Sequence, residues 1–348
     1  MEEVLNSPAS LNIMRSLHDN GYGSHHSVAS LASTCRSTWE MYLANKRELT
    51  RYKIPRDEIK YIDGRLLHPR MQPNGGHLVA SLEYSEPGER GLIVVIDMRS
   101  NKKVRWFRSY ERGLYDMCWS PCGRYIATVG GENFMRILDV EGSEPSRILR
   151  GIGEAAWSVS WSPCGKYILT GLHDQSILLW NFEERQIIHR IDKENDALIC
   201  SVSFSPDGTC FAYSNESGEL CVYDTKTFEC IHSLHVPDYW ATSISWHPSG
   251  EKLACGTLIW DLKTNCTQDT ISDIDGWDVK VAWSPDGTML ACETSKDIII
   301  FGENQKVFVR PKHTWWTFIG WEEDSSSILI VNRPNWTRGT SSIQRLVV

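Results

Sequence analysis

A short phrase recurs along the chain at a nearly constant interval, and it constrains the fold more than any other feature. An aromatic residue is followed by a polar residue, proline, any residue and glycine. The phrase begins at Trp119, Trp161, Phe204, Trp246 and Trp283, so the intervals are 42, 43, 42 and 37 residues. Weaker copies occur around Leu67 and Trp321. A fixed period of this size indicates a repeat architecture.

One repeat, from residue 157 to residue 190, predicts four short strands. WSVSW alternates and contains aromatic and β-branched residues, SPCG forms a turn, and KYILTG is a second strand. SILLW is apolar enough to be buried on both faces, whereas QIIHR has the polarity of an outer edge strand. Four short antiparallel strands per repeat, arranged in tandem, predict the blades of a β-propeller.

The third strands resemble those of WD repeats, which end in Trp-Asp. The matching stretches are SILLWNF (Ser176–Phe182), ELCVYDT (Glu219–Thr225), LIWDL (Leu258–Leu262) and FMRILDV (Phe134–Val140). The resemblance covers roughly Asp63 to Val348 and implies an all-β, seven-bladed WD-type propeller. The family often has Gly-His before the first strand of a repeat, and that His bonds an Asp of a later turn. Gly151-Ile152 stands in this place, so the sequence departs from that network.

Two local features predict how the ring is built. The last repeat is one strand short, so we expect an earlier segment, Thr50–Ile54 followed by Pro55, to pair beside Ser342–Val348 and close the ring. In the fifth blade no polar loop separates the second and third strands. We therefore expect a tight hairpin at Gly256-Thr257, with a notch in the rim where the longer loop is absent.

Residues 1–48 follow a helical pattern, so we divide the chain into a helical segment (1–48) and a propeller (49–348). The stretch LASTCRSTW (Leu31–Trp39) and the opening helix resemble an F-box, although Ser7-Pro8 replaces the usual Leu-Pro. In that family the helices bind the Skp-type adaptor of cullin ubiquitin ligases, and a following propeller holds the substrate. The resemblance assigns adaptor contacts to Leu11, Leu31, Cys35 and Trp39. The alternative is a helical cap that packs on the propeller's own flank.

Aromatic residues gather where the first strand of several blades begins. Six residues before the anchor aromatic, three consecutive blades have Trp240, Trp277 and Trp315, and four residues before it two blades have Tyr115 and Trp157. In the resembled family this end of the strand opens onto the face that usually holds partners. Tryptophan at a partly exposed rim is enriched in binding hot spots. The alternative is that these rings wedge between neighbouring blades.

Composition excludes several classes of function. The net charge of −8 argues against nucleic-acid binding, and no hydrophobic run is long enough to span a bilayer. The 11 cysteines form no CxxC pair, and no phosphate loop, metal-ligand spacing or catalytic constellation occurs. We therefore expect no cofactor or metal and no enzymatic activity. The acidic N-terminus lacks a secretory pattern, so a cytoplasmic or nuclear location is expected.

The sequence thus predicts a protein-interaction module that binds a protein or peptide on the propeller face. The favoured role is substrate receptor of a cullin-type ubiquitin ligase. The alternatives are a WD-repeat scaffold for a multiprotein complex without a ligase link and, with less support, a propeller enzyme.

Overall fold

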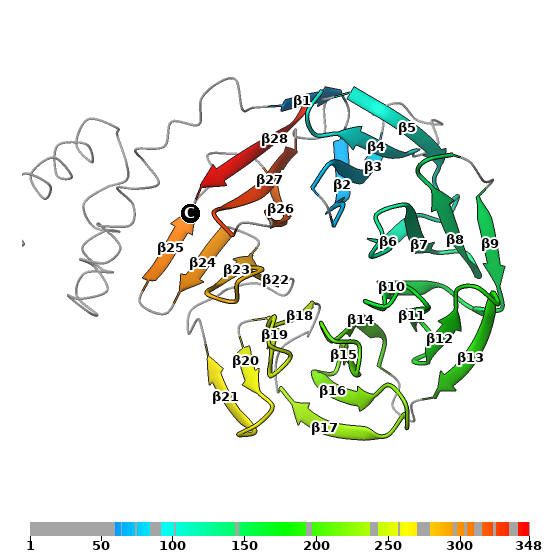
Figure 1. The fold of residues 1–348 in the computed structure, drawn as a ribbon, viewed down its shortest axis with the longest axis vertical. Helices are drawn as coiled ribbons and strands as arrows, with labels where there is room; N and C mark the ends of the chain where they lie inside the picture. Colours follow the sequence, from blue (N-terminus) through cyan, green and yellow to red (C-terminus); the bar gives the residue numbers. More distant parts are fainter. Residues whose placement is uncertain are drawn as a thin grey trace, which may run out of the picture.

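The computed structural model contains seven four-stranded sheets arranged around a ring (Figure 1). It describes residues 60–63, 65–73, 75–83, 92–100, 102–142, 146–192, 197–236, 243–256, 258–269, 279–294, 298–302, 305–309, 315–322, 325–333 and 340–347. No helix occurs within these ranges. The expected all-β, seven-bladed propeller is therefore confirmed, whereas the expected helices of residues 1–48 lie outside the described residues.

The blades follow one another along the chain, and each runs from an inner to an outer strand. Blade 1 contains β2 (Arg65–Met71), β3 (His77–Glu83), β4 (Leu92–Asp97) and β5 (Lys102–Arg108). Blade 2 contains β6 (Leu114–Trp119), β7 (Tyr125–Gly130), β8 (Phe134–Asp139) and β9 (Arg147–Arg150). Blade 3 contains β10 (Ala156–Trp161), β11 (Tyr167–Leu172), β12 (Ile177–Asn181) and β13 (Gln186–Ile191).

The remaining blades repeat this order. Blade 4 contains β14 (Ile199–Phe204), β15 (Cys210–Asn215), β16 (Glu219–Asp224) and β17 (Cys230–His235). Blade 5 contains β18 (Ile244–Trp246), β19 (Lys252–Cys255), β20 (Leu258–Asp261) and β21 (Cys266–Asp269). Blade 6 contains β22 (Lys280–Trp283), β23 (Met289–Glu293), β24 (Ile298–Gly302) and β25 (Gln305–Val309). Blade 7 contains β26 (Trp315–Trp321), β27 (Ser327–Arg333), β28 (Thr340–Val347) and, on its outer side, β1 (Lys60–Asp63).

The predicted closure segment was wrong, although the ring does close with a strand that precedes the first blade. β1 pairs antiparallel with β28, from Lys60 opposite Ile343 to Asp63 opposite Thr340. The closing strand is therefore Lys60–Asp63 rather than Thr50–Ile54, and the latter segment lies outside the described residues. The physical reason is distance along the chain: β1 and β2 are separated by a single residue, so a strand immediately before β2 reaches the edge of β28 without a long connection.

The repeated turn has the conformation that its residues predict. The five glycines of the recurring phrase all have positive φ, between 70° and 76°, at Gly123, Gly165, Gly208, Gly250 and Gly287. In four of the turns the serine hydroxyl accepts a hydrogen bond from the backbone N–H five residues later, as Ser162 Oγ does from Tyr167 N at 2.9 Å. The phrase thus recurs because each inner hairpin needs the same left-handed glycine and the same internal acceptor.

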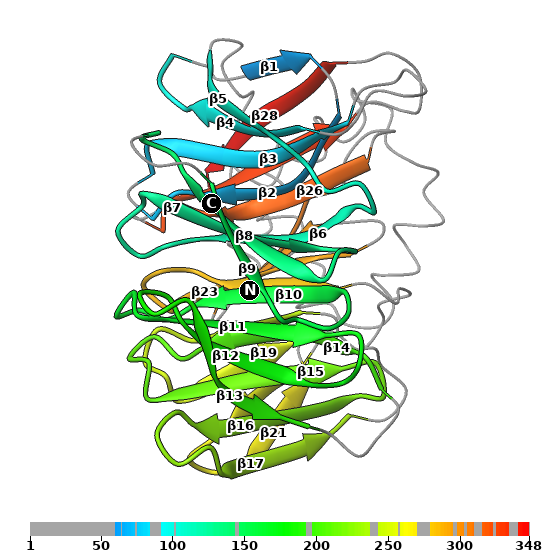
Figure 2. The same cartoon turned by 90° about the vertical axis from the view of Figure 1, so that its right-hand side faces the viewer.

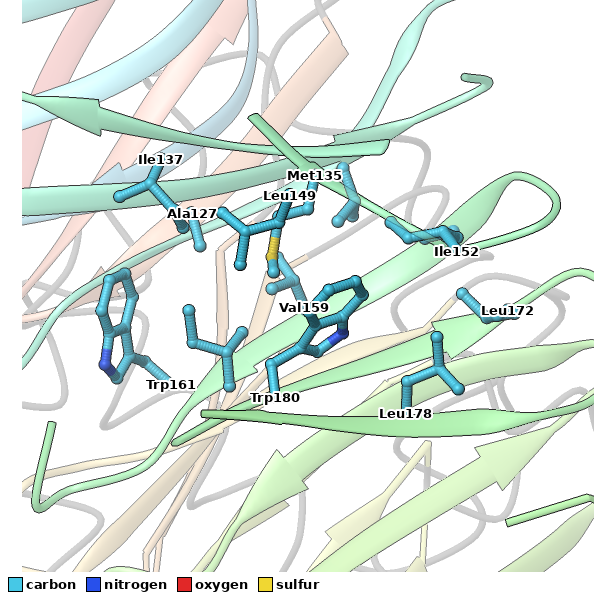
Figure 3. Packing of buried hydrophobic residues seen from close by; sticks show 13 residues of the cluster. Ala127, Met135, Ile137, Leu149, Ile152, Val159, Trp161, Leu172, Leu178 and Trp180 are labelled. Carbon is cyan, nitrogen blue, oxygen red and sulfur yellow. The ribbon is translucent and has the colours of Figure 1, made fainter. Parts of the chain in front are cut away.

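The hydrophobic core is divided into seven clusters, and each lies between two neighbouring blades. Alternate residues of the third strand face opposite neighbours: in β12, Leu178 and Trp180 pack toward blade 2, whereas Ile177 and Leu179 pack toward blade 4 (Figure 3). This two-sided burial explains why the third strands consist mostly of apolar residues.

The departure from the Gly-His pattern is filled by an apolar residue. Ile152 is fully buried in the cluster between blades 2 and 3. Trp180 Nε1 donates a hydrogen bond to Thr170 Oγ1 at 3.1 Å, so this buried indole is satisfied within its own blade. Apolar packing replaces the expected His–Asp pair here.

The predicted hairpin in blade 5 is confirmed. Cys255 pairs with Leu258 across the two-residue connection, and Gly256 has a φ of 56°. The predicted notch beside this hairpin stays a prediction, because Trp240 and Trp277 lie outside the described residues.

Candidate protein-interaction face

The inner strands of blades 2, 3 and 4 each contain an irregularity at the same place. In all three, the register to the second strand shifts by one residue near the start of the inner strand. The extra residues, which the register to the second strand skips, are Tyr115, Trp157 and Cys200, each four positions before the anchor aromatic. Such bulges change the direction of a side chain and are enriched next to functional sites. The repeat therefore directs one side chain per blade out of the regular strand.

Tyr115 and Trp157 stack on each other across the boundary between blades 2 and 3. Their ring centroids are 4.4 Å apart, and the ring planes are inclined by 10°. Trp157 is 38% exposed and Tyr115 is half-buried. Each ring therefore contacts the neighbouring blade, and Trp157 also presents apolar surface to solvent, whereas partner binding by these rings stays a prediction.

A hydrogen-bond network directly below the rings fixes them relative to each other. Asp116, the residue after Tyr115, accepts hydrogen bonds from the Ser158 hydroxyl at 3.2 Å and from the backbone N–H of Val159 at 3.1 Å. Ser158 in turn accepts a hydrogen bond from the backbone N–H of Val202 in blade 4 at 3.1 Å. The two bulged residues are thus followed by residues that join blades 2, 3 and 4.

The same carboxylate extends this network to blade 1. Arg70 Nη2 lies 2.8 Å from Asp116 Oδ1, and the two side chains are 40% and 14% exposed. One side chain therefore links the inner strands of blades 1, 2 and 3, so the stacked pair rests on a rigid support rather than on a loop.

Acidic residues recur on the turns that follow the second strands. Glu132, Asp174 and Glu216 are spaced by 42 residues. Glu132 accepts hydrogen bonds from the backbone N–H groups of Glu111 and Arg112, and Glu216 accepts one from Leu198 N at 3.3 Å. These carboxylates hold the connections that lead into the inner strands, so they position the bulges.

The acidic turn residue of blade 3 has different partners. Partial burial raises the pKa of Asp174, but hydrogen bonds from Ser176 and Arg190 outweigh it and lower the pKa. Nearby, His173 Nδ1 lies 3.5 Å from Glu154 Oε2, and both side chains are more than half exposed. His173 N also donates a hydrogen bond to Ala155 O at 2.9 Å, so this turn lies at the end of blade 3 where the inner strand of Trp157 begins.

Several residues that the sequence singled out cannot be placed beside this pair. Trp240 and Trp277 lie outside the described residues, and for Trp315 the structure describes only the backbone, as the first residue of β26. Their proximity to one another stays a prediction. The proposed adaptor contacts, Leu11, Leu31, Cys35 and Trp39, also lie outside the described residues.

The described residues contain neither a metal site nor a membrane-spanning helix. No group of three or more His, Cys, Asp or Glu side chains in this part of the chain has an arrangement that would hold a metal ion. A search of the same residues for a helix long and apolar enough to cross a bilayer finds none.

Comparison with known proteins agrees with the architecture. The model of the family "WD domain, G-beta repeat" matches residues 101–139, which extend from β5 to the end of β8. The repeat match and the seven blades support a WD-repeat β-propeller. The model of the family "Eukaryotic translation initiation factor eIF2A" matches residues 151–277, which lie within blades 3 to 5 and the connection to blade 6.

One curated relative is similar over part of the propeller. The p21-activated protein kinase-interacting protein 1-like of Gallus gallus is 31% identical over 91 residues, which make up 26% of this chain and 24% of the relative. The chain thus matches about a quarter of the length of that protein.

Proposed function

We propose that this protein is a non-enzymatic interaction module whose stacked pair of Tyr115 and Trp157 binds a segment of a partner protein. The observation that carries the proposal is that two equivalent bulges direct two aromatic rings to the same place, where they stack yet leave Trp157 38% exposed. Large aromatic rings on a rigid support supply contact area at a low conformational-entropy cost.

Comparative quantitative mass spectrometry of affinity-purified complexes tests this proposal. The full chain is compared with the double variant Tyr115→Ala/Trp157→Ala and with the matched control Ile231→Ala, which removes a 45% exposed apolar side chain on the outer strand β17. We expect one or more proteins to be lost from the double variant and retained by the control. Identical complexes from all three chains would refute the proposal.

The finer hypothesis is that the module is a substrate receptor of a cullin-type ubiquitin ligase. It is supported only by the F-box-like pattern of residues 1–48, with Leu11, Leu31, Cys35 and Trp39 as the adaptor contacts. Purification of the full chain and of a chain that begins at residue 49 distinguishes it from the scaffold alternative. Recovery of a Skp-type adaptor with the full chain alone would support the ligase hypothesis, and its absence from both would favour a scaffold.

The partner class has one further candidate. The Gallus gallus relative is called a kinase-interacting protein, so a protein kinase is a candidate partner for the aromatic pair. Loss of a kinase from the double variant in the same experiment would support this candidate. We keep the predicted cytoplasmic or nuclear location as a proposal, and fluorescence microscopy of a tagged full chain tests it.

A further inference from the structure

The outer strands of blades 1 to 3 carry a charge opposite to that of the whole protein, and the outer strand of blade 4 carries neither Lys, Arg, Asp nor Glu. The chain has a net charge of −8, yet the four outer strands β5, β9, β13 and β17 contain no Asp or Glu. The cations on these strands are Lys102, Lys103, Arg105, Arg108, Arg147, Arg150 and Arg190. Figure 2 shows these strands one below another on the side wall, with β5 uppermost. Four of the seven cations lie on β5.

β5 also carries the most exposed large apolar side chain among the described residues. Trp106 is 68% exposed, and Val104 on the same strand is 45% exposed. This mostly exposed indole is not part of the described core, because Trp106 is absent from the seven buried clusters and their partly buried neighbours. Aromatic and arginine side chains on an exposed rim are the residue types enriched at protein interfaces.

Contacts with blade 2 and with the buried cluster between blades 1 and 2 fix the position of β5, the strand that contains Trp106. Phe107 packs on the buried cluster between blades 1 and 2. Arg105 donates hydrogen bonds to the backbone carbonyls of Val140 at 3.1 Å and Glu141 at 2.7 Å in blade 2. β5 is therefore a rigid edge, and a ligand that binds it does not have to order the strand first.

Within the described residues, β5 is the outermost strand of blade 1. In the described sheet of blade 1, β5 is the last strand and has only β4 as a neighbour. It spans seven residues, whereas the outer strands of blades 2 to 6 span four to six. An edge strand presents unpaired backbone N–H and C=O groups that can bond to an additional strand. The like charges of two β5 strands would oppose pairing with a second copy of this chain, whereas an acidic strand would be attracted.

We propose that β5 is a docking site for an extended acidic segment of a partner protein, which adds a strand to the outer edge of blade 1. The backbone of the segment pairs with β5, its carboxylates face Lys102 and Arg108, and an apolar side chain contacts Trp106. This site is separate from the stacked pair of Tyr115 and Trp157 and does not depend on it. A protein segment is favoured over RNA or a lipid surface for two reasons. The net charge of −8 repels extended polyanions, and the basic stretch is only one strand long, which matches a short peptide segment.

Fluorescence anisotropy of the full chain with a labelled peptide tests this inference. The probe is a fluorescein-labelled peptide that matches β5 in length and has Glu at every position except a central Val. The matched probes are the peptide with Lys in place of each Glu (the Lys–Val peptide) and the Glu–Val peptide with N-methyl groups on all of its peptide nitrogens, which blocks strand pairing along both edges. Single-stranded oligouridylate and phosphatidylserine vesicles serve as the other polyanions.

We expect the Glu–Val peptide to bind, and the Lys–Val and N-methylated peptides to bind at least tenfold more weakly. Trp106→Ala should weaken binding about tenfold to thirtyfold, as loss of a hot-spot aromatic does. Lys102→Glu/Arg108→Glu should weaken it further, and Ile231→Ala should leave it unchanged. The proposal would be overturned if the methylated peptide bound as tightly as the Glu–Val peptide. It would also be overturned if the RNA or the vesicles bound and the Glu–Val peptide did not. Circular dichroism of each variant verifies that the fold is retained, which is expected because Trp106 lies outside the core.

Discussion

Asp116 is the residue whose removal tests most directly how the aromatic pair is supported. Its carboxylate accepts hydrogen bonds from Ser158 Oγ, from Val159 N and from its own neighbour Met117 N, and it pairs with Arg70. The replacement Asp116→Ala leaves these donors without their acceptor. Ser158 and Val159 are 5% and 4% exposed, so water does not readily replace the carboxylate there.

The expected magnitude follows from these contacts. A buried donor that loses its acceptor costs about 1–3 kcal/mol. Arg70 is 40% exposed, so its charge can return to solvent and the ion pair contributes at most about 1 kcal/mol. Because Ser158 can rotate its hydroxyl and some relaxation occurs, we expect a total loss of about 2–4 kcal/mol in local stability around Asp116, at the boundary of blades 1, 2 and 3.

Hydrogen–deuterium exchange measures this loss blade by blade, which suits a repeat fold that can open locally. Protection of the peptides that cover β6 and β10 should fall by about thirtyfold to several hundredfold, since 1.4 kcal/mol is about tenfold. The matched control is Asp192→Ala, whose ion pair with Arg190 is exposed and should contribute less than about 1 kcal/mol. If Asp116→Ala exchanged no faster than Asp192→Ala, the network would not support the rings.

Three further predictions concern single turns and thiols. Gly256→Val should lower the free energy of unfolding by about 1–3 kcal/mol in urea titrations, because a β-branched residue is strained at a φ of 56°; an unchanged midpoint would contradict the assigned hairpin. Partial burial raises the pKa of Cys164, but hydrogen bonding, first of all with Ser162, outweighs it and lowers the pKa, so this exposed thiol should react with Ellman's reagent before the buried ones. Cys164→Ser should remove one thiol from the fast phase, to which the exposed Cys122, Cys230 and Cys266 also contribute, and a fast phase of unchanged amplitude would contradict this assignment. A hydrogen bond from Ser284 lowers the pKa of Asp286 from 3.8 to about 2, so the ionised carboxylate stabilises the fold above about pH 4, and this stabilisation is lost as the pH falls toward 2. The urea midpoint of Asp286→Asn should therefore fall less over this range than that of the unmodified chain, and an equal fall would count against this account.

The blades could be predicted from the sequence because each depends on short-range chemistry. Pro and Gly at a fixed offset specify the inner turn, and the alternation of WSVSW or the apolar run of SILLW specifies how many faces of a strand are buried. The structural roles of residues such as Gly165 and Trp180 can therefore be predicted from the sequence immediately around them. The same reasoning predicted the hairpin at Gly256, where the structure shows the expected positive φ.

The closing strand could not be found in this way. Lys60–Asp63 is only four residues long, and its strand formers Tyr61 and Ile62 are matched by Tyr52 and Ile54 of Thr50–Ile54, which is followed by a proline that resembles a stop signal. A short outer strand forms because a neighbour offers unpaired backbone groups, and the sequence of the strand itself hardly reports this. Its identity depends on the distance to β2, which is a property of the assembled ring.

The candidate site was predicted only in part for a related reason. The sequence placed Tyr115 and Trp157 at one end of the inner strands, but it gave no indication that bulges would stack them. It also missed Asp116 and Ser158, although their spacing of 42 residues follows the repeat and makes them equivalent positions. Trp106 was missed because a tryptophan within a strand is ordinarily buried, and its exposure depends on β5 being the last strand of its sheet.

Photo-crosslinking from position 157 tests the central claim most directly. The chain is produced in cells with p-benzoylphenylalanine at position 157, and a second chain carries it at position 231 on the outer strand of blade 4. After irradiation, crosslinked proteins are identified by mass spectrometry. We expect position 157 to yield a discrete partner that is lost when Tyr115→Ala is added, and position 231 not to yield it. Failure of position 157 to crosslink any protein beyond those captured at position 231 would contradict the assignment of this face as the binding site.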